Sequence, residues 1–292
     1  MSLSPPGSPV VSVIIAVHNE ERFVGDAIDS ILSQTLSPLE LIVIDDASSD
    51  ATPVILQRIA DTRIQVVRNE VNLGLTASLN RGLAAARGAF VARLDGDDIA
   101  RPDRLALQVD FLERHPDVGI VGSSRRVVDE QGTFLYEATA IPDDAAIRWR
   151  LLLGNPLAHP TVMIRRSVLD KHELRYDESF RTAQDYELWT RLAAVTKTAN
   201  LVEPLVTYRR RQTGISVSRR DEQLATHDRI AGLAFERLLP GFEISTEEVR
   251  QLRGRYGGQS VREPEMDPAE PKWQELLEAV RREFDRQSRS FL

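Results

Sequence analysis

The chain has 292 residues, of which 42% are hydrophobic and 28% are charged, a composition typical of a globular protein with one large domain or two small ones. Its formal net charge of −7 argues against nucleic acid as a general partner. The absence of cysteine excludes disulfides and thiolate metal sites and fits a reducing compartment.

The apolar runs of the chain, such as residues 10–17, are too short to span a bilayer, so no transmembrane segment is predicted. Residues 1–9 carry neither a basic segment nor a long apolar core, which excludes a secretory signal there. Their serine, proline and glycine content predicts a disordered lead-in.

Between residues 10 and 122, short apolar runs alternate with stretches of helical periodicity. This alternation predicts an α/β fold with a mostly parallel central sheet flanked by helices. Glycine often follows the last turn of a helix, so we expect Gly88 to close the third helix. The predicted elements, in chain order, are a strand at 10–17, a helix at 20–34, a strand at 39–44, a helix capped by Ser49 or Asp50, a strand at 63–68, a helix at 75–87, a strand at 89–94, a helix at 102–115 and a strand at 118–121.

The second half of the chain is less regular, and from residue 219 it is charged and helical in period. An apolar stripe in this last part has roughly helical spacing, and we expect it to pack on the domain or on a second subunit of a homodimer. The stripe consists of Leu224, Ile230, Leu233 and Leu238. Before it we predict a hairpin at 125–129 and 133–136, a helix at 143–153, a strand at 161–164, a helix at 184–194 and a strand at 201–209.

An acidic cluster follows the predicted strand at 89–94, where Asp95, Asp97 and Asp98 are spaced Asp-x-Asp-Asp. The carboxyl ends of strands are where open α/β sheets bind ligands. Three neighbouring carboxylates repel one another unless a cation neutralises them, and hard oxygen ligands suit Mg²⁺ or Mn²⁺. Such an ion could bridge a diphosphate and make it a better leaving group. The alternative is an ordinary Asp-Gly turn with solvated carboxylates.

Several nucleotide-binding folds are excluded by missing motifs. The first strand leads into His18 and Asn19 rather than a Gly-x-Gly-x-x-Gly loop, which argues against a dinucleotide-binding site. No phosphate-binding loop of the Gly-x-x-x-x-Gly-Lys type is present. Sugar nucleotidyltransferases use a glycine-rich loop and a lysine, and lysine is restricted here to Lys171, Lys197 and Lys272.

A series of motifs then follows in a fixed order: VSVIIAVHNEE at 11–21, IDDASSD at 44–50, NLGL at 72–75, ARLDGDD at 92–98, RPDRL at 101–105, NPLAHPT at 155–161 and QDYELW at 184–189. Together they resemble the family 2 glycosyltransferases of the GT-A fold. The resemblance covers about residues 10–216. It implies a transferase domain at 10–218, with a donor half at 10–122 and an acceptor half at 123–218, followed by a helical C-terminal extension at 219–292.

The resemblance implies a metal-dependent, inverting transfer of a sugar from a nucleotide-diphosphate sugar, with a UDP-sugar favoured, to the hydroxyl of a glycan or lipid-linked acceptor. The metal would be Mn²⁺ or Mg²⁺. The setting would be surface polysaccharide biosynthesis in the bacterial cytoplasm, at the inner face of the membrane if Arg219 and Arg220 contact anionic lipid. The alternatives are a catalytically weak nucleotide-sugar-binding protein and a sugar nucleotidyltransferase.

Residue roles follow from the same resemblance. Asp185 is the candidate catalytic base, with Glu187 as a substitute. Where the family usually has Glu, this chain has Gln184, and the missing charge is expected to lower the pKa of Asp185. Asp46 is expected to accept a hydrogen bond from the nucleobase. Nucleotide contacts are also expected from Val17, Asn19, Glu20 and Asp95, and Asp97 is the expected metal ligand, with Asp95 beside it.

Other residues are expected to contact the donor sugar, the acceptor or the diphosphate: Asn80, Arg93, Asp98, His159, Arg209 and Arg211. Arg211 occupies the position of a family histidine, and since an arginine cannot ligate a metal, it is expected to pair with phosphate. A buried, hydrogen-bonded histidine is the alternative for His159, and simple charge balance is the alternative for Arg93.

Overall fold

The structure is a computed structural model, and it describes residues 8–211, 220–256 and, apart from 277 and 281, 275–283. The expected lead-in and the basic pair Arg219 and Arg220 fall largely outside these residues, except that the backbone of Arg220 begins a helix. Among the described residues, no helix combines the length and hydropathy needed to cross a bilayer.

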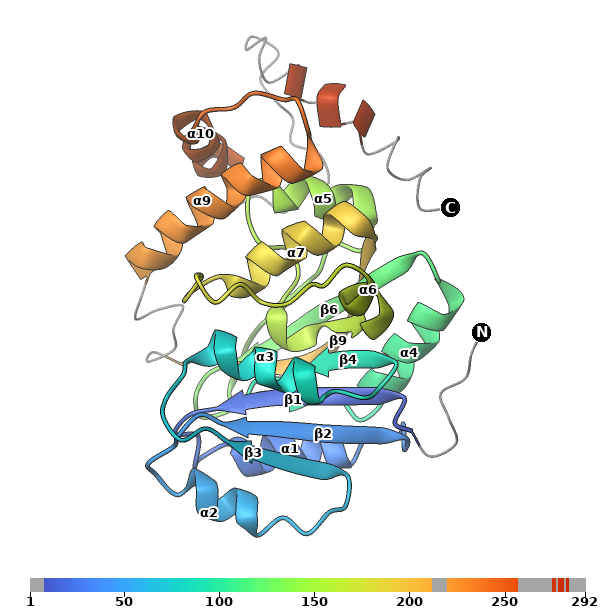
Figure 1. The fold of residues 1–292 in the computed structure, drawn as a ribbon, viewed down its shortest axis with the longest axis vertical. Helices are drawn as coiled ribbons and strands as arrows, with labels where there is room; N and C mark the ends of the chain where they lie inside the picture. The colour runs from blue at the N-terminus through green and yellow to red at the C-terminus, as the bar shows by residue number, and fades with distance from the viewer. Residues whose placement is uncertain (1–7, 212–219, 257–274, 277, 281, 284–292) are drawn as a thin grey trace.

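A single nine-stranded sheet organises the fold, with strand order β3-β2-β1-β4-β8-β6-β9-β5 and β7 paired to β6 (Figure 1). The first four strands are parallel, as predicted, and β8 then joins antiparallel to β4. The strands are β1 (Val11–Val17), β2 (Leu39–Asp45), β3 (Ile64–Arg68), β4 (Phe90–Arg93), β5 (Ile99–Ala100), β6 (Val118–Val128), β7 (Phe134–Ala138), β8 (Met163–Arg165) and β9 (Lys197–Arg209).

Helices cover both faces of the sheet. They are α1 (Val24–Leu32), α2 (Thr52–Gln57), α3 (Leu75–Ala85), α4 (Arg104–Arg114), α5 (Asp144–Leu151), α6 (Arg166–Lys171), α7 (Gln184–Val195), α9 (Arg220–Leu238) and α10 (Thr246–Tyr256), with a 3₁₀ turn at His159–Thr161. Alternate residues of β1 face opposite sides, so that Val13 and Ile15 pack with α1 and α4, whereas Ile14 packs with α3 and α7. A covered sheet of this kind explains why β1 and β2 read as nearly continuous apolar runs.

The C-terminal helices extend the core on the α7 side, where α9 lies along α7 (Figure 1). Ile230 and Leu238 are fully buried in the same apolar cluster as Trp189 of α7. The expectation that the stripe packs on the domain is therefore confirmed for these two residues, whereas Leu224 is exposed.

Several details differ from the sequence predictions, among them the start of α2, whose N-cap is Ala51 rather than Ser49 or Asp50. The strand at 118–121 and the first arm of the hairpin are one continuous strand, β6, and α6 and the short β5 were not predicted. Gly88 does not end α3 in a left-handed conformation, because α3 ends at Ala85 and Ala86 is extended. Gly88 instead allows close backbone approach, since an added Cβ would lie 2.6 Å from the Ser12 amide nitrogen.

Candidate active site

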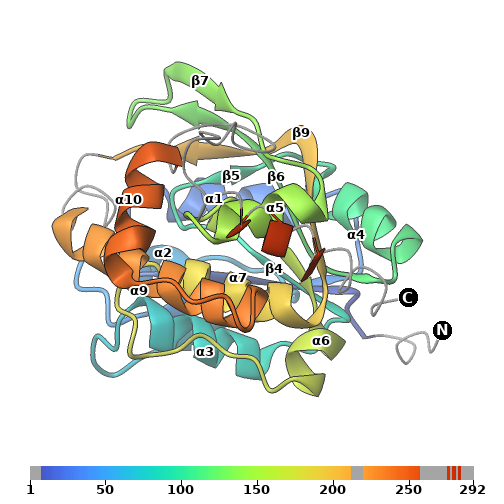
Figure 2. The ribbon, with the colours of Figure 1, turned by 90° about the horizontal axis from the view of Figure 1, so that it is seen from above.

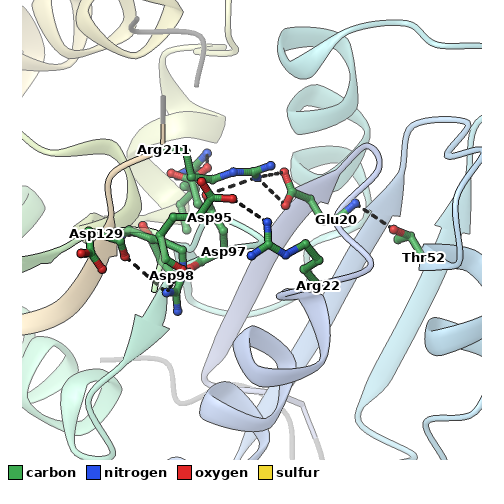
Figure 3. A network of polar contacts seen from close by, with 11 residues as sticks. Glu20, Arg22, Thr52, Asp95, Asp97, Asp98, Asp129 and Arg211 are labelled. Atoms are coloured by element: carbon green, nitrogen blue, oxygen red, sulfur yellow. Dashed lines mark hydrogen bonds and ion pairs between the residues drawn. The ribbon is translucent and has the colours of Figure 1, made fainter. Parts of the chain in front are cut away.

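Polar residues gather where β1, β2 and β4 reach their carboxyl ends. The parallel register places Val17 opposite Asp45, and Asp46 follows directly. Asp95, Asp97 and Asp98 follow β4, and one carboxylate oxygen of each lies within 4.8 Å of the others (Figure 3). Three convergent carboxylates are a donor set suited to Mg²⁺ or Mn²⁺, so the predicted cluster could hold a metal ion.

Burial sets the electrostatics of this cluster. Asp98 is fully buried, its Oδ1 accepts a hydrogen bond from the Arg209 amide (2.8 Å), and its Oδ2 has no partner among the described residues. Burial, reinforced by Asp95 and Asp97, raises the pKa of Asp98 well above its usual value. Burial and the charges of Asp95 and Glu20 raise the pKa of Asp97 to about 7. A bound divalent ion would favour the ionised form of both groups.

Arg211 lies among these carboxylates (Figure 3), and its expected pairing with phosphate stays a prediction. Its Nη1 is 2.7 Å from both carboxylate oxygens of Glu20 and 3.5 Å from Oδ2 of Asp97. The Glu20 amide donates to Thr52 Oγ1 (2.8 Å), which fixes the loop after β1 against α2. Burial raises the pKa of Glu20 despite this arginine. The guanidinium thus sits where it neutralises part of the acidic cluster.

Arg209 is occupied by protein carbonyl groups. Its Nε donates to the Asp97 carbonyl (3.1 Å) and its Nη1 to the Glu130 carbonyl (3.1 Å), while the guanidinium lies over the Phe23 ring at 4.5 Å. These contacts join β9, the aspartate loop and the β6–β7 turn. The expectation of a diphosphate contact by Arg209 stays a prediction, which these hydrogen bonds do not favour.

Arg93 is buried at the centre of the site and forms an ion pair with Asp95. Its Nε and Nη1 have no hydrogen-bond partner among the described residues. Arg104, also fully buried, donates to the Arg93 carbonyl (2.8 Å). Burial, with a smaller contribution from the Arg93 charge, lowers the pKa of His159, and the same charge opposes the rise that burial causes in the pKa of Asp185.

Asp185 lies in the first turn of α7, after Ala183 in a left-handed conformation (φ 55°). Its Oδ2 accepts a hydrogen bond from Asn155 Nδ2 (2.7 Å). Burial raises its pKa above the usual value for an aspartate. The lowering expected from Gln184 is relative to a glutamate at that position and stays a prediction, while burial sets the direction of the overall shift.

The substitute base, Glu187, is held in ion pairs, which do not favour a role as a base. Glu187 is 1% exposed and is held by Arg191 (2.6 Å) and by Arg237 of α9 (3.0 Å). Its carboxylate is committed to the contact between α7 and α9. The helical periodicity of the sequence could not predict the ion pair with Arg237, since this arginine lies far along the chain from Glu187.

His159 and Asn80 both form hydrogen bonds with Tyr176. Nε2 of His159 is 2.8 Å from the Tyr176 hydroxyl, and burial lowers the pKa of His159 well below its usual value. This is the buried, hydrogen-bonded histidine named above as the alternative. Asn80 donates to the Tyr176 carbonyl (2.9 Å) and to Glu178 (3.0 Å), and it accepts from the Tyr176 amide (2.9 Å). Its amide thus anchors this segment to α3 instead of reaching the aspartates.

Asp46 organises the loop before α3. Oδ1 accepts from Asn69 Nδ2 (2.6 Å) and from the Leu73 amide (2.8 Å), and Oδ2 accepts from the Gly74 amide (2.8 Å). Asn19, in a left-handed conformation, accepts from the Ser49 amide (2.8 Å) and so ties the loops after β1 and β2 together. The residues predicted to surround the nucleotide therefore share one edge of the sheet, and their roles remain predictions.

Sequence reasoning missed three residues that shape this site. Arg104 and Asn155 lie in motifs quoted above, which was the signal that could have identified them. Tyr176 lies in no motif, and only its contacts with His159 and Asn80 reveal it.

The sequence profile described as "Glycosyl transferase family 2" matches residues 12–173. An uncharacterised glycosyltransferase of Haemophilus influenzae is 33% identical over 214 residues, which is 69% of this chain and 65% of that protein. The O-antigen biosynthesis glycosyltransferase WbnJ of Escherichia coli is 33% identical over 206 residues, covering 68% of this chain and 79% of WbnJ. Among solved structures, S. aureus TarS 1–349 in complex with UDP-GlcNAc superposes with a TM-score of 0.64 at 19% identity, covering 84% of this chain and 71% of that chain. At this identity the likeness concerns the fold, which is of the GT-A type.

Proposed function

The chain belongs to glycosyltransferase family 2, and on that premise we propose that it transfers a sugar, with inversion, from a nucleotide-diphosphate sugar to the hydroxyl of a glycan or lipid-linked acceptor. The observation that carries the proposal is the pairing of two features. Three carboxylates converge at the end of β4, and a buried aspartate, Asp185, lies in the first turn of α7, where the charge of Arg93, the partner of Asp95, acts on it. The carboxylates could hold a cation that stabilises an anionic leaving group, and Asp185 could act as a base.

In the proposed reaction, Asp185 accepts the proton of the acceptor hydroxyl as its oxygen forms a bond to the anomeric carbon. The bond from that carbon to the diphosphate breaks, and the electron pair leaves with the nucleoside diphosphate. The raised pKa of Asp185 suits this role, because a base is most effective when its pKa lies nearer the working pH. A Mn²⁺ or Mg²⁺ ion held by Asp97 and Asp95 would stabilise the charge that develops on the diphosphate.

The donor is proposed to be a UDP-sugar, bound along the edge formed by Val17, Asn19, Glu20 and Asp46. The TarS structure, whose fold this chain shares, contains UDP-GlcNAc. The name of WbnJ places that relative in O-antigen biosynthesis, which supports a role in surface polysaccharide assembly for this chain. We further propose that residues 10–122 bind the donor and residues 123–218 the acceptor, with the reaction taking place at the cytoplasmic face of the membrane.

A catalytically weak nucleotide-sugar-binding protein is the second candidate. Two observations favour it. Gln184 replaces a glutamate that the family usually has, and Arg211 already pairs with Asp97, the expected metal ligand.

The experiment is thermal unfolding with UDP-, GDP-, dTDP- and CMP-sugars, each with and without Mn²⁺. A ligand that binds only the folded state raises the melting temperature. We expect a Mn²⁺-dependent rise with one nucleotide class, lost in Asp97→Ala and kept in Asp110→Ala, an exposed carboxylate on α4. No rise with any nucleotide would refute the donor site, and a rise without any turnover, measured as release of nucleoside diphosphate, would favour the second candidate.

A further inference from the structure

Arg125 of β6 is a half-buried cation without an anionic partner. Its side chain makes no hydrogen bond or ion pair with any residue that the structure describes, and its guanidinium lies over the ring of Tyr208, 5.6 Å from the ring centre. Removing a charge from water is costly unless an opposite charge or hydrogen bonds compensate. An anionic group of a ligand would supply this compensation.

The strand register shows which side chains share the face of Arg125. Val127 is paired with Tyr136 on β7 and with Tyr208 on β9, so both tyrosines lie on the face of Val127. A shift in register between Val127 and Val128 separates Tyr136 from Phe134, which is paired with Val128 on the opposite face. Side chains two residues apart on a strand also share a face, which adds Arg125. With neighbouring strands about 4.8 Å apart, the two tyrosines are roughly 10 Å apart across β6. We call these three residues, Tyr136, Arg125 and Tyr208, the tyrosine–arginine row.

Arg126 provides a natural comparison. It is the next residue of β6 and points to the opposite face, where its guanidinium lies over the Phe134 ring at 4.7 Å. It is exposed, whereas Arg125 is half-buried. The two arginines therefore have the same charge and nearly the same backbone position, but only one belongs to the row.

The row leads from the surface to the aspartate cluster. Tyr136 is 48% exposed, and its strand, β7, lies at the margin of the molecule (Figure 2). Burial and the charges of Asp95, Asp98 and Asp97 raise the pKa of Tyr208 to about 12. Arg209 fixes this geometry, because its amide binds Asp98 and its side chain binds the carbonyl of Glu130 in the β6–β7 turn. The hairpin and the candidate active site are thus one connected unit.

We propose that the tyrosine–arginine row binds the acceptor glycan, with sugar rings against the two tyrosines and a carboxylate or phosphate group of the glycan paired with Arg125. The inference rests on the proposed transferase function. An aromatic ring offers apolar area with a polar edge, which matches the C–H face and hydroxyl groups of a sugar. A guanidinium pairs bidentately with carboxylates and phosphates. Since the chain carries a net charge of −7 and the aspartates lie close by, an anionic glycan would be repelled without such a cation.

The test measures weak binding by saturation-transfer NMR on the full chain, with methyl β-D-glucuronide, glucose 6-phosphate and the neutral methyl β-D-glucoside as probes. We expect the better of the two charged sugars to bind roughly fivefold more tightly than the neutral one, the size expected of one partly exposed ion pair. The sugar that shows this preference identifies the anionic group as carboxylate or phosphate. Arg125→Gln is expected to remove the preference, Arg125→Lys to keep it in part, and Arg126→Gln to leave it unchanged. Tyr136→Ala is expected to weaken the binding of charged and neutral sugars equally.

A second experiment separates this inference from the proposed function. It measures the binding of UDP with Mn²⁺ to the same variants through the rise in their melting temperature. If UDP stabilises the wild type and Arg125→Gln equally while the charge preference is lost, the inference stands. If Arg125→Gln weakens UDP binding, Arg125 belongs to the donor site and the inference is wrong. It is equally wrong if Arg126→Gln has the same effect as Arg125→Gln, or if a protein stabilised by UDP shows no preference for either charged sugar. If neither UDP nor any other nucleotide of the panel above stabilises the wild type, the proposed function itself is refuted.

Discussion

At the scale of single residues, Asp185 has the environment of a general base. Replacing it by Asn keeps the shape of the side chain but removes the proton acceptor, so we expect kcat to fall by roughly 10²–10⁴-fold, the range of general base catalysis. Binding of the donor, measured by thermal shift, should not change. Asp170→Asn, at an exposed position, is the control. Retention of full turnover by Asp185→Asn would remove the assigned base.

The pH dependence of turnover tests the same residue. Because the pKa of Asp185 is raised by burial, its base form should be lost as the pH falls through a value above the ordinary pKa of an aspartate. The hydrogen bond from Asn155 favours the ionised form, so Asn155→Ala should move this limb of the pH–kcat profile to higher pH. A limb that does not move would show that another group titrates.

The pKa of Asp97 leads to a separate prediction, which concerns the pH dependence of stability. Its pKa in the folded protein is about 7, raised from 3.8, so the folded state binds more protons than the unfolded state between these values. The free energy of unfolding should therefore fall as the pH rises from 4 to about 7 and then level off, with ~4 kcal/mol as the upper bound from this group. The measurement is urea unfolding without metal at a series of pH values. The decrease in the free energy of unfolding with pH should be smaller in Asp97→Asn than in the wild type. Mn²⁺ should stabilise the wild type more at pH 8 than at pH 6, and equal stabilisation at both would contradict the assignment.

At the scale of elements, the parallel half of the sheet could be predicted because β1, β2 and β4 are buried on both faces and read as short apolar runs. The continuous β6 could not, because its middle carries Gly122, Ser123 and Ser124, which look like a turn in sequence but are buried between β9 and neighbouring loops. The two residues of β5 are too few to give a periodic signal.

The candidate site shows the same limit. The aspartates could be located from their motif, and so could Asp185, because a motif is local. Glu187 has a partner 50 residues away in sequence, Arg237, and Arg209 has one 79 residues away, Glu130. Only the tertiary structure shows that these two side chains contact other groups of the protein.

Gly88, two residues before β4, gives a prediction for the contact between this segment and β1. In Gly88→Ala the new Cβ would lie 2.6 Å from the Ser12 amide nitrogen, so β1 and the segment before β4 must separate. We expect a loss of roughly 1–3 kcal/mol in the free energy of unfolding. Gly232→Ala is the matched control, since an added Cβ inside α9 meets nothing within 4 Å and alanine favours a helix by about 1 kcal/mol. Equal effects of the two substitutions would show that the approach at Gly88 is unimportant.

At the scale of the whole molecule, the transferase domain and the C-terminal helices share one hydrophobic cluster. Ile230, Phe235 and Leu238 of α9 are at most 1% exposed, and they pack with residues of α7 such as Trp189. Burial of each such side chain contributes roughly 1.5–3 kcal/mol, while whole domains are stable by only about 5–15 kcal/mol. The predicted boundary near residue 218 marks where the family motifs end. It does not separate two hydrophobic cores, because α7 and α9 share one.

Deletion of residues 220–292 should consequently destabilise the transferase domain itself. We expect the shortened chain to be poorly soluble, to bind the dye ANS through exposed apolar surface and to unfold without a sharp transition, whereas the full chain unfolds cooperatively. Leu238→Ser in the full chain should lower the melting temperature for the same reason, and Leu224→Ser, at a position 51% exposed, should not. A soluble shortened chain with an unchanged melting temperature would show that the helices are an appendage. Loss of stability would instead mean that α9 helps to hold α7, and with it Asp185, in place.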